Sequence, residues 1–267
     1  MLSKALGISA VRPTRSVRCL VVLGLAALAS AGMATAAGPI NIGDGGDQHE
    51  GVGQSDPLTK LQPGSFYTAS KFPVGLKIRP PDALWGAVQH ESGSYSFVQL
   101  AHAHRAGTPP LSGVGYITLE SATVATPSAA RALANLRATP HMKIGPTRAV
   151  TVAGVHGQMF DATITGVDVT KYCKANKSLC SNGISLEPFL PNHHCGFCET
   201  TMHHETQDVK FAGVGQLFRM IVLTAHGKVV VIYIESIYAI QKKFPPAKLF
   251  PTFLPYAQKM LAGISLS

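Results

Sequence analysis

From Ser65 onward the chain alternates apolar and polar residues in short runs, which is the pattern of half-buried β-strands. Residues 66–78 predict one or two strands that stop at Pro80-Pro81, because proline cannot continue a hydrogen-bonded ladder. Ser94–His102 and Gly113–Val124 predict two more strands. In the second of these runs, alternation separates two sets of side chains onto opposite faces: Tyr116, Thr118 and Glu120 on one, and Ile117 and Leu119 on the other.

Two hairpins are predicted farther along the chain. The first joins Arg148–Val152 to Gln158–Thr165 across the Gly154–Gly157 turn. The second joins Gly215–Thr224 to Lys228–Ser236. The last of these strands contains the uninterrupted apolar run VVVIYI, which is typical of a strand in the middle of a sheet.

Two segments predict helices. Pro127–Thr139 has apolar residues three and four apart, with Thr126 as the expected N-cap and Pro127 at the first helical position. In Pro251–Ile264 the two prolines, Pro251 and Pro255, predict a late start or a kink. Its apolar stripe consists of Phe253, Leu254, Ala257, Met260 and Leu261. Hairpins together with two separated helices predict an α+β fold, in which helices pack on an antiparallel sheet.

The first 37 residues have the pattern of a secretory signal peptide. A basic region precedes the apolar run Cys19–Gly32, which is short for a bilayer span. Ala34-Thr35-Ala36 then supplies the small residues that signal peptidase requires. A retained anchor is the alternative interpretation, in which case this segment alone would contact the membrane. We expect a secreted, periplasmic or cell-envelope protein.

Residues 38–64 are rich in glycine, aspartate and proline and predict a flexible tether, whereas residues 65–267 are long enough for a single α+β domain. Residues 38–267 hold 19 Lys and Arg against 14 Asp and Glu, a net charge of +5. Basic residues do not form a run interleaved with aromatics, so the sequence argues against nucleic-acid binding. It supports at most weak attraction to anionic lipid or envelope polymer.

The order of these segments and their hydrophobic patterns resemble those of the PsbP-like α/β/α sandwich, a fold also used by small exported bacterial proteins. The resemblance rests on four features: Phe72-Pro73 before an apolar strand, Pro81 and Trp85 at a corner, Gly154 and Gly157 in a hairpin, and Gly227-Lys228 at the turn of a long hairpin. It covers roughly residues 66–165 and 211–267. By analogy it implies a non-catalytic accessory, ligand-holding or scaffold domain.

A Cys/His-rich insertion at about residues 168–210 departs from the pattern of that fold. It holds four cysteines, Cys173, Cys180, Cys195 and Cys198. In an exported protein an even set of cysteines predicts disulfides, because no reducing pool keeps the thiols free. Three pairings of the four cysteines are possible. In some of them the disulfides close small loops, and in others they close the whole insertion.

A metal site is the alternative for the same insertion. Its candidate ligands lie within twelve residues: Cys195, Cys198, His193, His194, His203 and His204. Four of them would be enough for zinc or copper. A third interpretation treats Cys195 and Cys198 as a thioredoxin-type dithiol, although the motif does not open a helix in a βαβ unit as that chemistry normally requires.

The acidic residues are isolated along the strands, and their spacing does not predict catalysis. His102 and His104 could complete a metal site, but a solvated strand end explains them better. We therefore expect a non-catalytic binding or accessory protein of the cell envelope, whose partner is a small molecule, a lipid or an envelope protein. Its predicted apolar ligand contacts, between the sheet and the insertion, are Trp85, Phe189 and Phe197. The alternative function is a metal-binding or thiol-disulfide redox protein.

Overall fold

The computed structural model describes residues 38–43, 59–92, 95–102, 115–122, 127–165, 183–186, 188–189, 210–213, 215–236 and 246–267. Contacts within the chain separate residues 1–36 from Ala37–Ser267, and all described residues belong to the second unit. None of the described helices is long and apolar enough to cross a bilayer.

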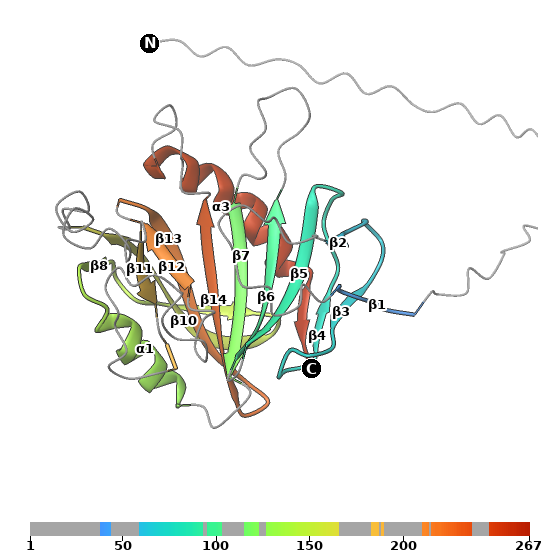
Figure 1. Cartoon of the computed structure of the whole chain (residues 1–267), viewed down its shortest axis with the longest axis horizontal. Helices are drawn as coiled ribbons and strands as arrows, with labels where there is room; N and C mark the ends of the chain where they lie inside the picture. Colours follow the sequence, from blue (N-terminus) through green and yellow to red (C-terminus); the bar gives the residue numbers. More distant parts are fainter. Residues whose placement is uncertain are drawn as a thin grey trace, which may run out of the picture. The chain divides into compact units, whose positions relative to one another are not determined.

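The centre of the described unit is a nine-stranded antiparallel sheet (Figure 1). Its order is β2-β5-β6-β7-β14-β13-β10-β8, and β9 pairs with β10 on the same edge as β8. The strands are β2 (Thr59–Lys60), β5 (Trp85–Ser92), β6 (Tyr95–His102), β7 (Gly115–Ala122), β8 (Met142–Ile144), β9 (Arg148–Val152), β10 (Val155–Ile164), β13 (Leu217–Ala225) and β14 (Lys228–Ser236).

Two smaller sheets accompany the central one. The first has the order β1-β3-β4-β15, with β1 parallel to β3 and the other pairs antiparallel. The second pairs β11 with β12. The bounds of these strands are β1 (Ile40–Asn41), β3 (Tyr67–Ala69), β4 (Leu76–Ile78), β11 (Gly183–Leu186), β12 (Lys210–Gly213) and β15 (Ile264–Leu266).

The two helices in the described ranges cover opposite faces of the central sheet. Helix α3 (Pro246–Ala262) packs against β7, β13 and β14, and helix α1 (Ala129–Arg137) against β13 and β14 (Figure 1). Alternation along β14 separates the two contacts: Val230, Ile232 and Ile234 belong to the cluster of α3, and Val229, Val231 and Tyr233 to that of α1. We call these sides the α3 face and the α1 face. The predicted α+β fold with an antiparallel sheet is therefore confirmed.

The α3 face is closed by the helix and by the four-stranded sheet. Phe253, Ala257, Met260 and Leu261 of α3 are buried there, as the apolar stripe predicted. The four-stranded sheet adds buried side chains from β3, β4 and β15 to the same cluster. Burial of this apolar area is the main contribution to the stability of the fold.

Both predicted hairpins are present, but the first turn is shorter than the predicted Gly154–Gly157, because residues 155–157 already pair with β9 as part of β10. Each has a two-residue turn in which both residues have positive φ: 53° and 77° at Ala153 and Gly154, and 48° and 75° at His226 and Gly227. Positive φ at both positions gives the backbone twist that matches two antiparallel strands. The predicted place of VVVIYI is also confirmed, because β14 lies between β7 and β13.

The helix boundaries differ from those predicted. Ser128, not Thr126, is the N-cap of α1, and its hydroxyl accepts a hydrogen bond from the Arg131 amide at 3.2 Å. Helix α3 begins at Pro246 and contains both prolines, so the expected late start is wrong. Burial of its apolar side offsets the backbone hydrogen bonds that proline cannot donate. Residues 264–266 leave the helix and form β15 instead.

The predicted tether is wrong at both of its ends. Residues 40–41 form β1 and residues 59–60 form β2, and Ile42 and Leu61 are fully buried. Residues 44–58 lie outside the described part of the chain. The sequence analysis also missed β5, in which Gln89 and His90 interrupt the apolar pattern although both are buried. The polar residues of β5 concealed the strand from a search for alternation, because both of its faces are covered and polar residues are buried along with apolar ones.

Candidate ligand-binding site

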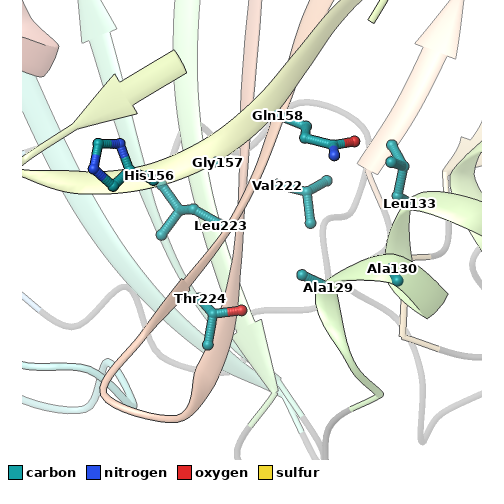
Figure 2. A pocket seen from close by; sticks show the side chains of 9 residues that line it. All are labelled: Ala129, Ala130, Leu133, His156, Gly157, Gln158, Val222, Leu223 and Thr224. Atoms are coloured by element: carbon teal, nitrogen blue, oxygen red, sulfur yellow. The ribbon is translucent and has the colours of Figure 1, made fainter. Parts of the chain in front are cut away.

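A pocket of about 260 Å³ opens between helix α1 and the strands β10 and β13 (Figure 2). Figure 2 shows Ala129, Ala130 and Leu133 of α1 across from Gln158 and Val222 of the sheet. The other lining residues are His156, Gly157, Leu223 and Thr224. The pocket therefore has an apolar helical wall and a strand wall that mixes apolar and hydrogen-bonding groups.

Small residues give the pocket its space. The first two residues of α1 are alanines, which directly follow the N-cap Ser128. Opposite them, Gly157 lets β10 approach β13 closely, because a Cβ atom there would lie 2.6 Å from the Val222 carbonyl oxygen and 2.8 Å from the Leu223 Cβ atom. Any larger residue at this position would push the two strands apart. The shape of the pocket is thus built into the helix start and the strand pairing.

The residues that line the pocket within the described part of the chain include no Asp, Glu, Lys or Arg. His156, Gln158 and Thr224 are exposed and provide an imidazole, an amide and a hydroxyl. The Nδ1 atom of His156 lies 3.0 Å from the Thr151 hydroxyl, and this contact restrains the ring. Neutral groups of this kind hydrogen-bond a neutral ligand while the alanines, Leu133 and Val222 contact its apolar part.

A second set of polar side chains lies on the α1 face, over β5, β7 and β14. His90, Thr118, Glu120 and Glu235 are all buried, with exposed fractions of 2% for Thr118 and 4% for Glu120. Alternation and strand register place them on one side of the sheet. Glu235 accepts a hydrogen bond of 2.5 Å from the Gln216 amide, and His90 stacks on Phe97 with 4.3 Å between ring centroids. We call this set the polar half of the α1 face.

His102 is not a solvated strand end, which corrects the expectation for this residue. Its side chain is only 3% exposed and lies on the α3 face. The ring centroids of Trp85 and Tyr256 are 4.9 and 4.5 Å from that of His102, and its Nε2 atom is 3.8 Å from the Asp82 carboxylate. The imidazole is held by aromatic packing between β6 and α3. His104 lies outside the described residues.

The structure does not bring the predicted ligand contacts together. Trp85 is buried on the α3 face, 6.2 Å from Phe253 between ring centroids, whereas Phe189 is buried in the cluster of α1. The sheet separates them, so the two residues cannot contact one ligand. Phe197 lies outside the described residues, as do all the predicted cysteine and histidine ligands: Cys173, Cys180, Cys195, Cys198, His193, His194, His203 and His204. The disulfides and the metal site therefore stay predictions.

The pocket residues were not predicted from the sequence, in which Gly154–Gly157 was interpreted only as a hairpin turn. The signals that point to the pocket are a glycine inside a strand and two alanines at a helix start. Neither signal shows that the helix starts over that strand.

Comparisons with protein-family models, with characterised proteins and with solved structures find no match to this chain. Within the described ranges, no three His, Cys, Asp or Glu side chains come close enough to hold a metal ion. The pocket is therefore the feature of the described residues from which a function is inferred.

Proposed function

We propose that the protein is an exported, non-catalytic binding or accessory module of the cell envelope, which holds a small uncharged ligand in the pocket beside α1. The observation that carries the proposal is the composition of the pocket wall: apolar side chains from α1 face a strand wall with neutral hydrogen-bonding groups. Pockets of this composition bind compact neutral molecules, because a charged ligand would lose its hydration without gaining an ionic partner.

The arrangement of the two helices supports a PsbP-like sandwich as the wider family of the fold. Helices α1 and α3 lie on opposite faces of one antiparallel sheet, which agrees with an α/β/α order of layers. Folds of this kind serve many functions, so the fold argues for a binding module only by analogy. The pocket is the stronger support.

The test uses the secreted chain and neutral probes of about ten non-hydrogen atoms, since 260 Å³ corresponds to the liquid volume of roughly nine waters. Indole, benzamide and 2-phenylethanol combine an aromatic body with a hydrogen-bonding group and serve as probes. We expect at least one of them to shift the NMR resonances of Ala129, Ala130 and Gly157 in a saturable way.

Two matched variants decide whether the pocket is the site. Ala130→Phe fills the pocket, whereas Ala134→Phe adds the same ring at an exposed position one turn later on α1. Probe binding should disappear in the first variant and persist in the second. Equal binding by both variants, or no saturable shift with any probe in the unaltered chain, would refute the proposal.

The insertion is proposed to be held by two disulfides among Cys173, Cys180, Cys195 and Cys198. The mass of the secreted protein tests this directly. A denatured mass four hydrogens below the all-thiol value, with no adduct under native conditions, supports two disulfides. An all-thiol mass with a native metal adduct would instead support the alternative, a metal-binding or redox protein that uses Cys195, Cys198 and the neighbouring histidines.

A further inference from the structure

The edge strands of the two larger sheets differ in length. Within the described ranges, β1, β2, β8 and β15 lie at edges and have two or three residues each. Such short edges are one means by which proteins prevent a foreign strand from pairing. β9 also lies at an edge, because its described pairing is with β10 alone, but it has five residues, Arg148–Val152. We call these five residues the docking edge.

The register of β9 with β10 shows which backbone groups of the docking edge point away from β10. Val152 and Val155 flank the two-residue turn and form the first pair of the hairpin. Residues that flank such a turn exchange backbone hydrogen bonds, and every second pair beyond them does the same. The next bonded pair contains Val150, so the N–H and C=O groups of Ala149 and Thr151 point outward. Both of these residues are exposed.

The side chains of the docking edge leave these outward groups accessible. Ala149 is small, Thr151 is uncharged, and the strand contains no proline, which is a common protection of an edge. Arg148 is the only charged residue of β9, and it donates a hydrogen bond of 3.1 Å to Asp161 on β10. This contact holds the guanidinium over its own sheet instead of beyond the edge. The docking edge can therefore accept a further strand.

The charges beside the docking edge favour an acidic partner. Arg219 donates two hydrogen bonds to Asp161, of 2.6 Å from Nε and 3.0 Å from Nη2. Its side chain is 11% exposed, whereas that of Arg148 is 52% exposed. Two guanidinium groups share one carboxylate, and the unbalanced positive charge is exposed at Arg148. A carboxylate directly opposite Arg148 on an added strand would stabilise the pairing, and a cation there would oppose it.

Alternation specifies the other residues of the partner. Arg148, Val150 and Val152 are on the α3 face, whereas Ala149 and Thr151 are on the α1 face. An added strand would form non-hydrogen-bonded pairs with the first three, in which the side chains of the two strands lie close together. Apolar side chains suit the positions opposite the two valines. Read along an antiparallel strand, the preferred order is apolar-x-apolar-x-acidic.

We propose that the docking edge binds an extended acidic peptide of a partner protein, which adds to the central sheet as an antiparallel strand. A second copy of this chain is a poorer partner through the same strand, because its β9 carries an arginine and no carboxylate. The docking edge shares no residue with the described lining of the pocket. The peptide and the pocket ligand are therefore separate partners, and a test of one does not decide the other.

The experiment measures binding of the secreted chain to a fluorescent peptide by anisotropy. The peptide has the core Val-Thr-Val-Thr-Glu between Gly-Ser flanks, and a matched peptide has lysine in place of the glutamate. Two variants of the chain form a matched pair. Ala149→Pro removes an outward N–H group, whereas Ala149→Ser keeps it. Because the N–H group of Ala149 does not bond to β10, both variants should retain the β9–β10 hairpin.

We expect the acidic peptide to bind and to slow the hydrogen exchange of the Ala149 and Thr151 amides. The lysine peptide should bind about fivefold more weakly. Ala149→Pro should weaken binding of the acidic peptide by about tenfold or more, and Ala149→Ser should change it little.

Equal binding by the two variants, equal binding of the two peptides, or binding of neither would overturn the proposal. Self-association of the chain through β9 without peptide binding would do the same. If Ala149→Pro fails to fold, Arg148→Gln replaces it and should remove the preference for the acidic peptide. A preference that persists in that variant would also overturn the proposal.

Discussion

The two faces of the central sheet differ in how far their apolar surface extends. On the α3 face, apolar side chains continue from β5 through β6, β7 and β14 to β13, and α3 and the four-stranded sheet cover them. On the α1 face, apolar side chains dominate β10, β13 and most of β14, whereas β5, β7 and the end of β14 carry the polar half with His90, Thr118, Glu120 and Glu235. The α3 face is thus a continuous apolar core, whereas the α1 face combines an apolar core with buried polar groups.

This difference shows that burial and hydrophobicity are separate properties of a strand. Thr118 and Leu119 are neighbours on β7 and both are buried, but they face opposite sides of the sheet. Burying a polar group is unfavourable unless it is hydrogen-bonded, so the α1 face keeps Thr118, whose Oγ1 atom has no hydrogen-bond partner among the described residues, at a cost in stability. We therefore expect the α3 face to dominate the stability of the fold, whereas the pocket lies on the α1 face.

The largest expected effect is on the α3 face. Phe253→Ala should lower the free energy of unfolding by about 4 kcal/mol, because the fully buried ring packs on Trp85 and over Gly115 and leaves a cavity when removed. Leu136→Ala, its counterpart from α1, should cost about 3 kcal/mol, since it removes fewer buried carbons. Urea unfolding followed by circular dichroism measures both. A larger loss for Leu136→Ala would reverse the comparison.

A smaller effect is expected where α1 contacts the residues that follow β11. The buried side chain of Asn135 donates a hydrogen bond of 2.9 Å to the Pro188 carbonyl. Asn135→Ala leaves that carbonyl without its donor and should lower the free energy of unfolding by about 1–2 kcal/mol. Limited proteolysis between residues 166 and 210 should become faster in the variant. The exposed neighbour Ala134→Ser is the control, and equal cleavage of both variants would contradict the expectation.

The smallest and most specific effects come from two hydroxyls of β7 on opposite faces. Among the described residues, the Oγ1 atom of Thr118 has no hydrogen-bond partner, so Thr118→Val should stabilise the protein by about 1 kcal/mol. Ser121, on the α3 face, donates a hydrogen bond of 2.9 Å to the Val229 carbonyl. Ser121→Ala should therefore destabilise it by about 1 kcal/mol. Thermal unfolding of the two variants gives the signs, and the same sign for both would show that the faces do not differ in this way.

The sequence predicted the local elements well where one strong pattern covered the whole element. Alternation identified β6 and β7, the uninterrupted apolar run identified β14, Gly154 and Gly227 marked the hairpin turns, and most of the apolar stripe of α3 is buried as expected. Prediction failed where a segment is short or polar, as in β1, β2 and β5. These strands form because a neighbouring strand supplies their hydrogen bonds, and their own residues do not indicate that pairing.

The candidate sites were harder to predict from the sequence than the strands and helices. The pocket needs α1 to begin over Gly157 and Val222, and no local pattern specifies which strand a helix covers. Trp85 and Phe189 are both buried aromatics, yet they lie on opposite faces of the sheet. Asp161 lies beside Arg219 because of the register of β10 with β13, and it lies beside Arg148 because of the pairing of β9 with β10.

By itself, the sequence determined which segments form strands and hairpins, the antiparallel α+β class, and the excess of basic over acidic residues. Those properties depend on neighbouring residues and on composition. Only the tertiary structure decided that Thr118 and Glu120 of β7 are buried and that the helices take opposite faces. Each of these depends on strand order and register, which arise from packing between residues far apart in the chain.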